Sequence, residues 1–411
     1  MMPFPEFHSV QQRFDAPAPA DLPGALQQAF ARFQPRARIE PGQRVAVAVG
    51  SRGISRIAEL TSGAVAYLKG LGLRPFVVPA MGSHGGGSGP GQAAILADLG
   101  ITEARVGAPI VSSMEVVSLG TLDSGAEILV SRDACQADHL VLINRIKPHT
   151  LFRGPVESGL CKMLTIGLGK HKGAVNVHKY SLGRTIVPGA RRVMDNLSVL
   201  FGLGVVETPD HEIHALRVVG PEAIEQTDRE LLELAWALFP RLPIHDLDVL
   251  ILDEMGKNIS GAGMDPNVVG MWRREGGPRE PDYRTLIVLG LTPESHGNAT
   301  GIGMADLIPR RLRDTIDLEA TYTNCLTSWA PRSARIPLTL DNDRVILETL
   351  ARSLPDLQAA RIARIRSTLH LERFWVTAAL LPELRKMDTL VLDESPLEIR
   401  FDAEERLQPF P

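Results

Sequence analysis

The chain has 411 residues, and its 44 lysines and arginines against 48 aspartates and glutamates give a formal net charge of −4. This near balance excludes a general nucleic-acid or anionic-membrane binder, because such proteins carry a basic excess. Hydrophobic residues make up 44 % of the chain and charged residues 22 %, which is typical of a globular protein and excludes a disordered one. A chain of this length usually divides its core, so we expect two domains.

The cysteines and the N-terminal segment indicate the compartment. The three cysteines, Cys135, Cys161 and Cys325, form no CxxC pair, so neither a disulfide framework nor a structural zinc site is predicted. The segment MMPFPEFHSVQQRFDAPAP lacks the pattern of a signal peptide. No run of about 18 apolar residues predicts a membrane span. We therefore expect a cytoplasmic protein that contacts neither membrane nor nucleic acid.

Strands alternate with helices along the first half of the chain. Short apolar runs that end in glycine or polar residues predict buried strands at 44–50, 74–82 and 139–149. Segments with helical spacing and a glycine at their end predict helices at 57–72 and 91–100. The alternation predicts a parallel sheet with helices on both faces.

A second region follows a break near residue 240. The helical segment 230–239 ends in the proline-marked sequence PRLPIHD, and new apolar runs begin at 248 and 285. We predict an α/β fold of two domains, 1–240 and 245–411. Each is expected to hold a largely parallel sheet flanked by helices, with the active-site cleft between the domains.

Histidines and glycines gather in the loops that follow the predicted strands. His84 lies in MGSHGGGSGPG, His149 in KPHTLFRG and His178 in NVHKY. In open α/β sheets, ligands bind beyond the carboxyl ends of the strands, and glycine lets a loop approach a ligand closely. A histidine can exchange a proton near neutral pH, and its neutral ring binds nickel, zinc or copper. These loops therefore predict a site for proton transfer or metal binding.

Basic residues lie in the same loops. Lys162 follows the small-residue segment ESGLC, and its amine could neutralise a phosphate or form a covalent bond with a carbonyl-type group. Lys170 and Lys172 are either part of a solvated basic face or contacts to a phosphate. Arg52, at the end of the first strand, could clamp a carboxylate with two parallel hydrogen bonds.

The order and spacing of these residues resemble the nickel-pincer-nucleotide-dependent lactate racemase family. The features that carry the resemblance are GSRG at 50–53, MGSHGGG at 81–87 and KPH at 147–149, followed by Lys162 and, 16 residues later, His178. The family has a Thr-Arg pair, a Gly-x-His, a Pro-His, a lysine and a histidine 16 residues after that lysine. The likeness covers roughly residues 40–180 by motif.

The resemblance implies a role for each matching residue. Lys162 would carry the nickel pincer nucleotide covalently, and His178 would be the protein ligand of the nickel. His84 and His149 would be acid–base residues on opposite faces of the substrate, and Arg52 would bind its carboxylate. The implied reaction is racemisation or epimerisation of a 2-hydroxy acid by reversible hydride transfer to the cofactor. The implied partners are the substrate and the proteins that synthesise the cofactor.

The chain departs from the family pattern on the substrate side. Val49 stands where the family has an acidic residue, Ser51 replaces the threonine, and Gly53 replaces the following proline. We therefore expect Ser51 to contact a 2-hydroxy acid other than lactate, or a sugar acid. In the C-terminal domain we expect Lys257 or Asn258, and His296, to take part in substrate binding.

Two other functions fit the same residues. A zinc or iron hydrolase or lyase could use these histidines, with Asp210, His211, Glu212 and His214 as further ligand candidates. A non-catalytic anion-binding protein could cradle a phosphate in the glycine-rich stretch 167–173. The sequence leaves the exact substrate and the oligomeric state open.

Overall fold

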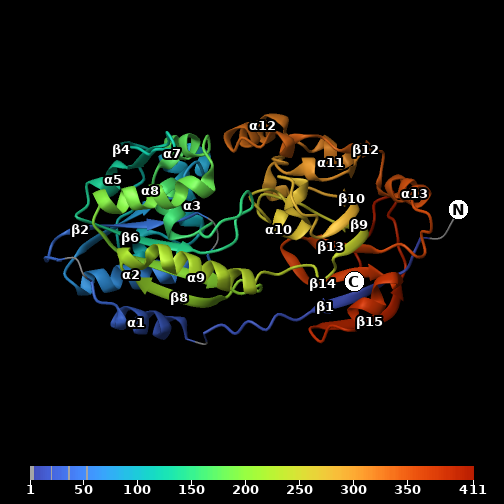
Figure 1. Cartoon of the computed structure of the whole chain (residues 1–411), viewed down its shortest axis with the longest axis horizontal. Helices are drawn as coiled ribbons and strands as arrows, with labels where there is room; N and C mark the ends of the chain where they lie inside the picture. Colours follow the sequence, from blue (N-terminus) through green and yellow to red (C-terminus); the bar gives the residue numbers. More distant parts are fainter. Residues whose placement is uncertain (1–3, 20, 36–37, 52–53) are drawn as a thin grey trace. The chain divides into compact units, whose positions relative to one another are not determined.

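The computed structural model describes residues 4–19, 21–35, 38–51 and 54–411. The chain divides into two compact units, one of residues Ala16–Phe239 and the other of Met1–Asp15 with Pro240–Pro411 (Figure 1). Both units combine helices with a mostly parallel sheet, which confirms the predicted α/β class. In the described part of the chain, no helix is both long and apolar enough to cross a membrane.

The N-terminal strand differs from the prediction, which placed the segment from residue 1 in the first domain. Strand β1 (Phe7–Gln12) pairs antiparallel with β14 (His370–Thr377) and β15 (Leu390–Leu397). Residues 1–15 therefore group with the C-terminal half of the chain. A six-residue strand carries too weak a pattern to reveal a partner more than 350 residues away.

A five-stranded sheet, in the order β3-β2-β6-β7-β8, forms the centre of the unit Ala16–Phe239. The first four strands are parallel, and the last pairs antiparallel with its neighbour. Their bounds are β2 (Arg44–Val49), β3 (Arg74–Pro79), β6 (His139–Arg145), β7 (Val199–Glu207) and β8 (Ile213–Val219). A separate hairpin consists of β4 (Val116–Thr121) and β5 (Glu127–Ser131). The loops after β2, β3 and β6 therefore leave the sheet at the same edge.

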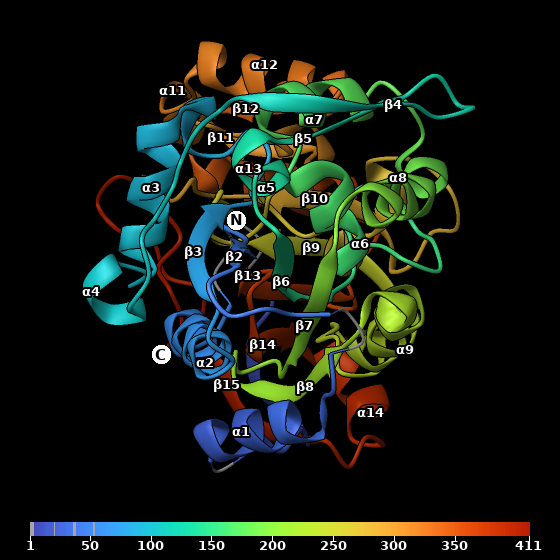
Figure 2. The same ribbon diagram turned by 90° about the vertical axis from the view of Figure 1, so that its left-hand side faces the viewer.

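Helices cover both faces of this sheet, as Figure 2 shows for α1 and α2 on one side and α6 and α8 on the other. Alternate residues of β2 explain this arrangement, because Val45, Val47 and Val49 face one apolar cluster while Ala46 and Ala48 face the other. The helices are α1 (Leu22–Arg32), α2 (Ile57–Gly70), α3 (Gly89–Asp98), α4 (Glu103–Val106), α5 (Arg132–Cys135), α6 (Leu160–Lys162), α7 (Lys170–Val177), α8 (Leu182–Asn196) and α9 (Ile224–Ala237). The short turns are η1 (Gly85–Gly87), η2 (Met163–Gly167) and η3 (Pro221–Ala223).

An eight-stranded mixed sheet, in the order β12-β11-β10-β9-β13-β14-β1-β15, forms the other unit. The strands from β12 to β13 are parallel, and the remaining pairings are antiparallel. The strands not yet given are β9 (Asp246–Leu252), β10 (Asp282–Val288), β11 (Leu307–Pro309), β12 (Leu338–Leu340) and β13 (Ile362–Ser367). The helices are α10 (Pro266–Val269), α11 (Arg310–Asp314), α12 (Leu318–Thr327), α13 (Asp343–Ser353) and α14 (Leu381–Leu384).

Candidate functional site

His84, the first of the predicted histidines, contacts Ser51 at the edge where the parallel strands of the five-stranded sheet have their carboxyl ends. Ser51 follows β2, His84 follows β3, and the Ser51 hydroxyl is hydrogen-bonded to Nδ1 of the half-buried His84. Glycine is required directly after this histidine, because Gly85 has a φ of +66° and a Cβ there would lie 2.5 Å from the carbonyl carbon of Gly91. The structure thus gives Ser51 a contact that orients the His84 ring. Arg52, the predicted carboxylate clamp, lies outside the described residues.

The second predicted histidine meets the predicted cofactor lysine. Nε2 of His149 lies 2.5 Å from Nζ of Lys162, and the same amine lies 3.5 Å from the Ser158 hydroxyl. Both side chains are half-buried. On its other side, Nδ1 of His149 accepts the N–H of Leu151 at 3.1 Å. The pair therefore combines a nucleophilic amine with an imidazole whose ring is already oriented by the backbone.

Two buried carboxylates that the sequence analysis missed hold this pair in place. Glu157 accepts the backbone N–H of His149 at 2.5 Å, and burial raises the pKa of Glu157. Asp228, in α9, accepts the N–H groups of Leu160 and Cys161 at 2.9 and 2.8 Å. Burial raises the pKa of Asp228 to about 6, although these two backbone bonds act in the opposite direction. Asp228 thus fixes the turn of α6 that ends at Lys162.

A π-helical turn follows Lys162 directly. In η2, the N–H of Leu168 donates to the carbonyl of Met163 at 2.9 Å, which is the wide i→i+5 pattern. Gly167 is needed there, because a Cβ would lie 2.5 Å from the carbonyl oxygen of Ala80. Single π-helical turns inside helices are rare and occur frequently at functional sites. Through Gly167, this turn brings the segment of Lys162 into close contact with the loop after β3.

His178, at the end of α7, has the properties of a neutral metal ligand. Its Nδ1 lies 2.6 Å from the carbonyl of Ala174, so Nδ1–H donates there and Nε2 keeps its lone pair. Burial lowers the pKa of His178, the bond to Ala174 acts in the opposite direction, and the positive charge of Lys162 lowers it further. The ring is therefore held in the neutral form that binds transition metals.

No group of three or more histidine, cysteine or acidic side chains that could hold a metal ion occurs among the residues that the structure describes. The HEIH run, considered above as a source of metal ligands, spans the end of the turn between β7 and β8 and the first two residues of β8. There His211 is exposed with a φ of +61°, and Nδ1 of His214 is bonded to the carbonyl of Pro17 at 2.8 Å.

Lys170 and Lys172, predicted to lie on a solvated basic face or to contact a phosphate, differ from each other. Lys170 is 0 % exposed, and its amine donates to the carbonyl of Pro79 at 2.7 Å and to Oε1 of Gln92 at 3.2 Å. It therefore does not present its amine to a ligand, contrary to the prediction. The reason is that two acceptors, the Pro79 carbonyl and the Gln92 amide oxygen, take up the amine inside the protein. Lys170 itself begins α7 with a φ of +54°. Lys172 is exposed on α7, so its predicted phosphate contact stays a prediction.

Lys257 and His296 belong to the other unit, at the ends of β9 and β10. The Lys257 amine donates to the carbonyl of Gly261 at 2.7 Å and to Oδ1 of Asn324 at 2.6 Å. The backbone N–H of Lys257 donates to Ser295 at 2.9 Å, directly beside the exposed His296. Nearby, Oδ1 of Asn258 accepts the Thr292 hydroxyl at 2.7 Å. The roles of these residues in substrate binding stay predictions.

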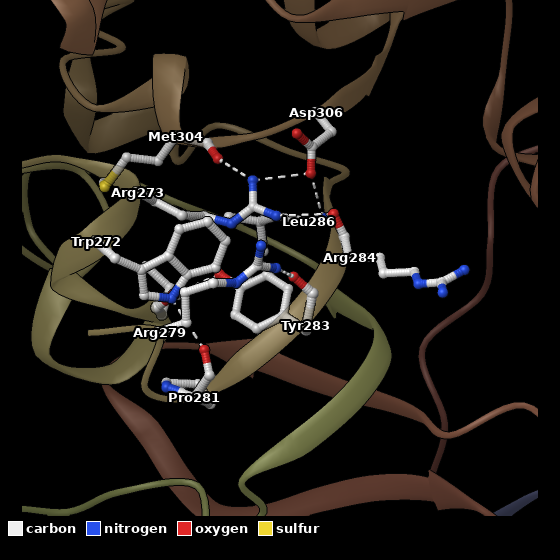
Figure 3. A network of polar contacts seen from close by, with 10 residues as sticks. Trp272, Arg273, Arg279, Pro281, Tyr283, Arg284, Leu286, Met304 and Asp306 are labelled. Atoms are coloured by element: carbon white, nitrogen blue, oxygen red, sulfur yellow. Dashed lines mark hydrogen bonds and ion pairs between the residues drawn. The ribbon is translucent and has the colours of Figure 1, made fainter. Parts of the chain in front are cut away.

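An arginine–aromatic stack in the same unit is structural (Figure 3). The Arg273 guanidinium lies over the rings of Trp272 and Tyr283, 4.7 and 4.6 Å from their centres. It also donates to the carbonyls of Met304 and Arg284 and pairs with Asp306 at 2.8 Å. These contacts of the guanidinium hold the segments around β10 together.

Comparison with solved structures shows a similarity of fold. The fold is similar to that of the lactate racemase apoprotein from Thermoanaerobacterium thermosaccharolyticum, with a TM-score of 0.53, 13 % sequence identity and coverage of 87 % of this chain and 94 % of that chain. No family model matches the sequence. No curated protein matches it either. The match shows a shared fold over most of both chains.

Proposed function

We propose that this protein is a racemase or epimerase of a 2-hydroxy acid that uses a nickel pincer nucleotide. The observation that carries the proposal is the contact between the Lys162 amine and Nε2 of His149. His178, whose pKa is lowered by burial and by the positive charge of Lys162, supports it as a neutral imidazole suited to nickel. The second acid–base pair, Ser51 with His84, follows strands of the same parallel sheet. The similarity of fold to a lactate racemase apoprotein supports the same function.

The residues present fit such a cofactor. Lys162 offers a half-buried amine as the covalent attachment point, and His178 offers the lone pair of Nε2 to nickel. A single protein ligand would be enough where the organic group supplies the other ligands of the nickel. When bound, the cofactor would supply the acceptance and return of a hydride at the carbinol carbon.

The protein would supply position and proton transfer. Ser51 engages Nδ1 of His84, and the Leu151 N–H donates to Nδ1 of His149, so Nε2 of each ring would be the atom that exchanges a proton. In the neutral His149 ring this Nε2 carries the proton. Interconversion of two enantiomers needs a proton acceptor on one face of the substrate and a donor on the other, and two histidines that exchange these roles would provide them. Because Val49 and Ser51 replace the family's acidic residue and threonine, we infer a substrate other than lactate.

A chiral assay tests this function. The protein is produced together with the cofactor-synthesis proteins and incubated with single enantiomers of 2-hydroxy acids and sugar acids, and the products are separated by chiral chromatography. We expect one enantiomer to be converted to the other, and a loss of about 10²-fold or more in His84→Ala and His149→Ala. Bound zinc without an organic adduct, or turnover that survives both substitutions, would contradict the proposal.

A further inference from the structure

A buried lysine and glutamine form a polar chain beneath the loop that carries His84. Both side chains are 0 % exposed. The Lys170 amine donates to Oε1 of Gln92 at 3.2 Å and to the carbonyl of Pro79, the last residue of β3, at 2.7 Å. Nε2 of Gln92 in turn donates to the carbonyls of Gly82 and His84, at 2.9 and 3.3 Å. These hydrogen bonds therefore connect Lys170 in α7, through Gln92 in α3, to the backbone carbonyl of His84.

The charge of the Lys170 ammonium group determines which atoms donate and which accept in these hydrogen bonds. An ammonium group can only donate, so Gln92 must turn its oxygen toward Lys170 and its nitrogen toward the two carbonyls. If the Gln92 amide were reversed, its NH₂ group would face the Lys170 ammonium group, and its oxygen would face the carbonyl oxygens of Gly82 and His84. Lys170 thus determines which end of Gln92 meets the loop, and the loop carbonyls are held as a consequence.

The loop needs such support because its own sequence is permissive. Gly82, Gly85, Gly86 and Gly87 all have positive φ values, from +59° to +66°. Glycine loses more backbone freedom on folding than any other residue, so four of them around one histidine give little intrinsic rigidity. The hydrogen bonds from Gln92 to the carbonyls of Gly82 and His84 restrain the part of the loop that determines the orientation of the His84 ring.

A buried amine at this position costs free energy, so a role in packing alone does not account for a lysine here. Burial lowers the pKa of Lys170 to about 8, although the charge of Asp133 acts in the opposite direction. The residue also holds a left-handed backbone conformation, which is uncommon for a side chain of this kind. A methionine would fill the same volume without either a buried charge or a need for acceptors.

We propose that Lys170 and Gln92 are positioning residues that set the orientation of the His84 ring. They act through the backbone of the His84 loop and touch neither substrate nor cofactor. The proposal rests on the proposed function only in that His84 is the acid–base group being placed. The arrangement can be tested in protein without cofactor, so its failure is distinguishable from failure of the function.

The test uses two variants and a matched control. Gln92→Glu keeps an acceptor for the Lys170 amine, which preserves the buried pairing, but removes the donor to the two carbonyls. Lys170→Met removes the amine and keeps the volume. Lys172→Met changes an exposed lysine two residues away on α7. In each protein we measure the imidazole ¹⁵N signals of His84 and the rate at which diethyl pyrocarbonate modifies it, read by mass spectrometry.

We expect the modification rate of His84 to change by about threefold or more in Gln92→Glu and Lys170→Met, with shifted ¹⁵N signals, because hydrogen bonding and exposure set the reactivity of an imidazole. The exposed His211 reports the reagent in the same sample and should react equally in all proteins. Lys172→Met should match the wild type. An unchanged rate and unchanged ¹⁵N signals in folded Gln92→Glu would overturn the proposal, whatever its effect on melting temperature.

Discussion

Gly159→Ala adds one methyl group at the start of the segment that carries Lys162. The backbone does not require glycine there, because its φ of 178° is extended and open to any residue. The obstacle is Asp228, since a Cβ at position 159 would lie 2.4 Å from its Oδ1 and 2.7 Å from its Cγ. Asp228 is 1 % exposed, so its carboxylate has little room to move aside.

The expected loss of local stability follows from the hydrogen bonds that the Asp228 carboxylate would no longer accept. It accepts two backbone N–H groups, from Leu160 and Cys161, at 2.9 and 2.8 Å. A hydrogen bond to a charged group contributes about 1.5–3 kcal/mol, so losing both costs about 3–5 kcal/mol after some relaxation. The opening free energy of α6 and η2 should fall by that amount, which is an increase in opening of about 10²-fold or more.

Amide hydrogen exchange followed by mass spectrometry measures this opening directly. Peptides that cover residues 156–168 should exchange faster in Gly159→Ala, while peptides from β15 in the other unit serve as the internal reference. The matched control is Gly183→Ala in α8, where a Cβ would meet only ordinary contacts from 3.6 Å outward. The control should exchange as the wild type does. An unchanged rate over 156–168 in Gly159→Ala would refute the role assigned to Asp228.

Further predictions concern Asp228 and the His84 loop. The folded pKa of Asp228, about 6, lies above its ordinary 3.8, so the wild type loses stability relative to Asp228→Asn as pH rises between these values, by about 3 kcal/mol in all. Urea unfolding of both proteins on either side of this range checks the sign, and a deficit of the variant that grows with pH would contradict it. Gly85→Ala should lower the melting temperature more than Gly86→Ala, because a Cβ at 85 would lie 2.5 Å from Gly91 whereas one at 86 meets nothing within 4 Å. Both positions share the cost of a positive φ, so equal melting temperatures would show that the Gly91 contact does not restrict the loop.

The sequence predicted the parts of the fold that local patterns determine. The strands β2, β3 and β6 lie within the predicted apolar runs, because a buried parallel strand is a short continuous run of β-branched residues. The antiparallel part of the second sheet escaped prediction. Its pairing joins β1 to strands near the other end of the chain, and strand pairing over such separations leaves no local signal.

The sequence predicted the chemically reactive side chains of the candidate site but not the buried groups that hold them. His84, His149, Lys162 and His178 were found because each lies in a loop or turn with distinctive neighbours. Asp228 was missed because it lies in an amphipathic helix 66 residues after Lys162, where an aspartate normally faces solvent. Lys170 was placed wrongly for the opposite reason, since a lysine beside glycine and histidine is expected at the surface.

The most direct test of the account is the chemical state of Lys162 in protein produced together with the cofactor-synthesis proteins. Peptide mass spectrometry and metal analysis are applied to the wild type, Lys162→Ala and the control Lys386→Ala, which changes an exposed lysine of the other unit, with an active lactate racemase produced in parallel. The account predicts an adduct on Lys162 and bound nickel in the wild type and in the control, and the loss of the adduct in Lys162→Ala. An adduct on another residue, or none while the parallel lactate racemase carries one, would contradict it.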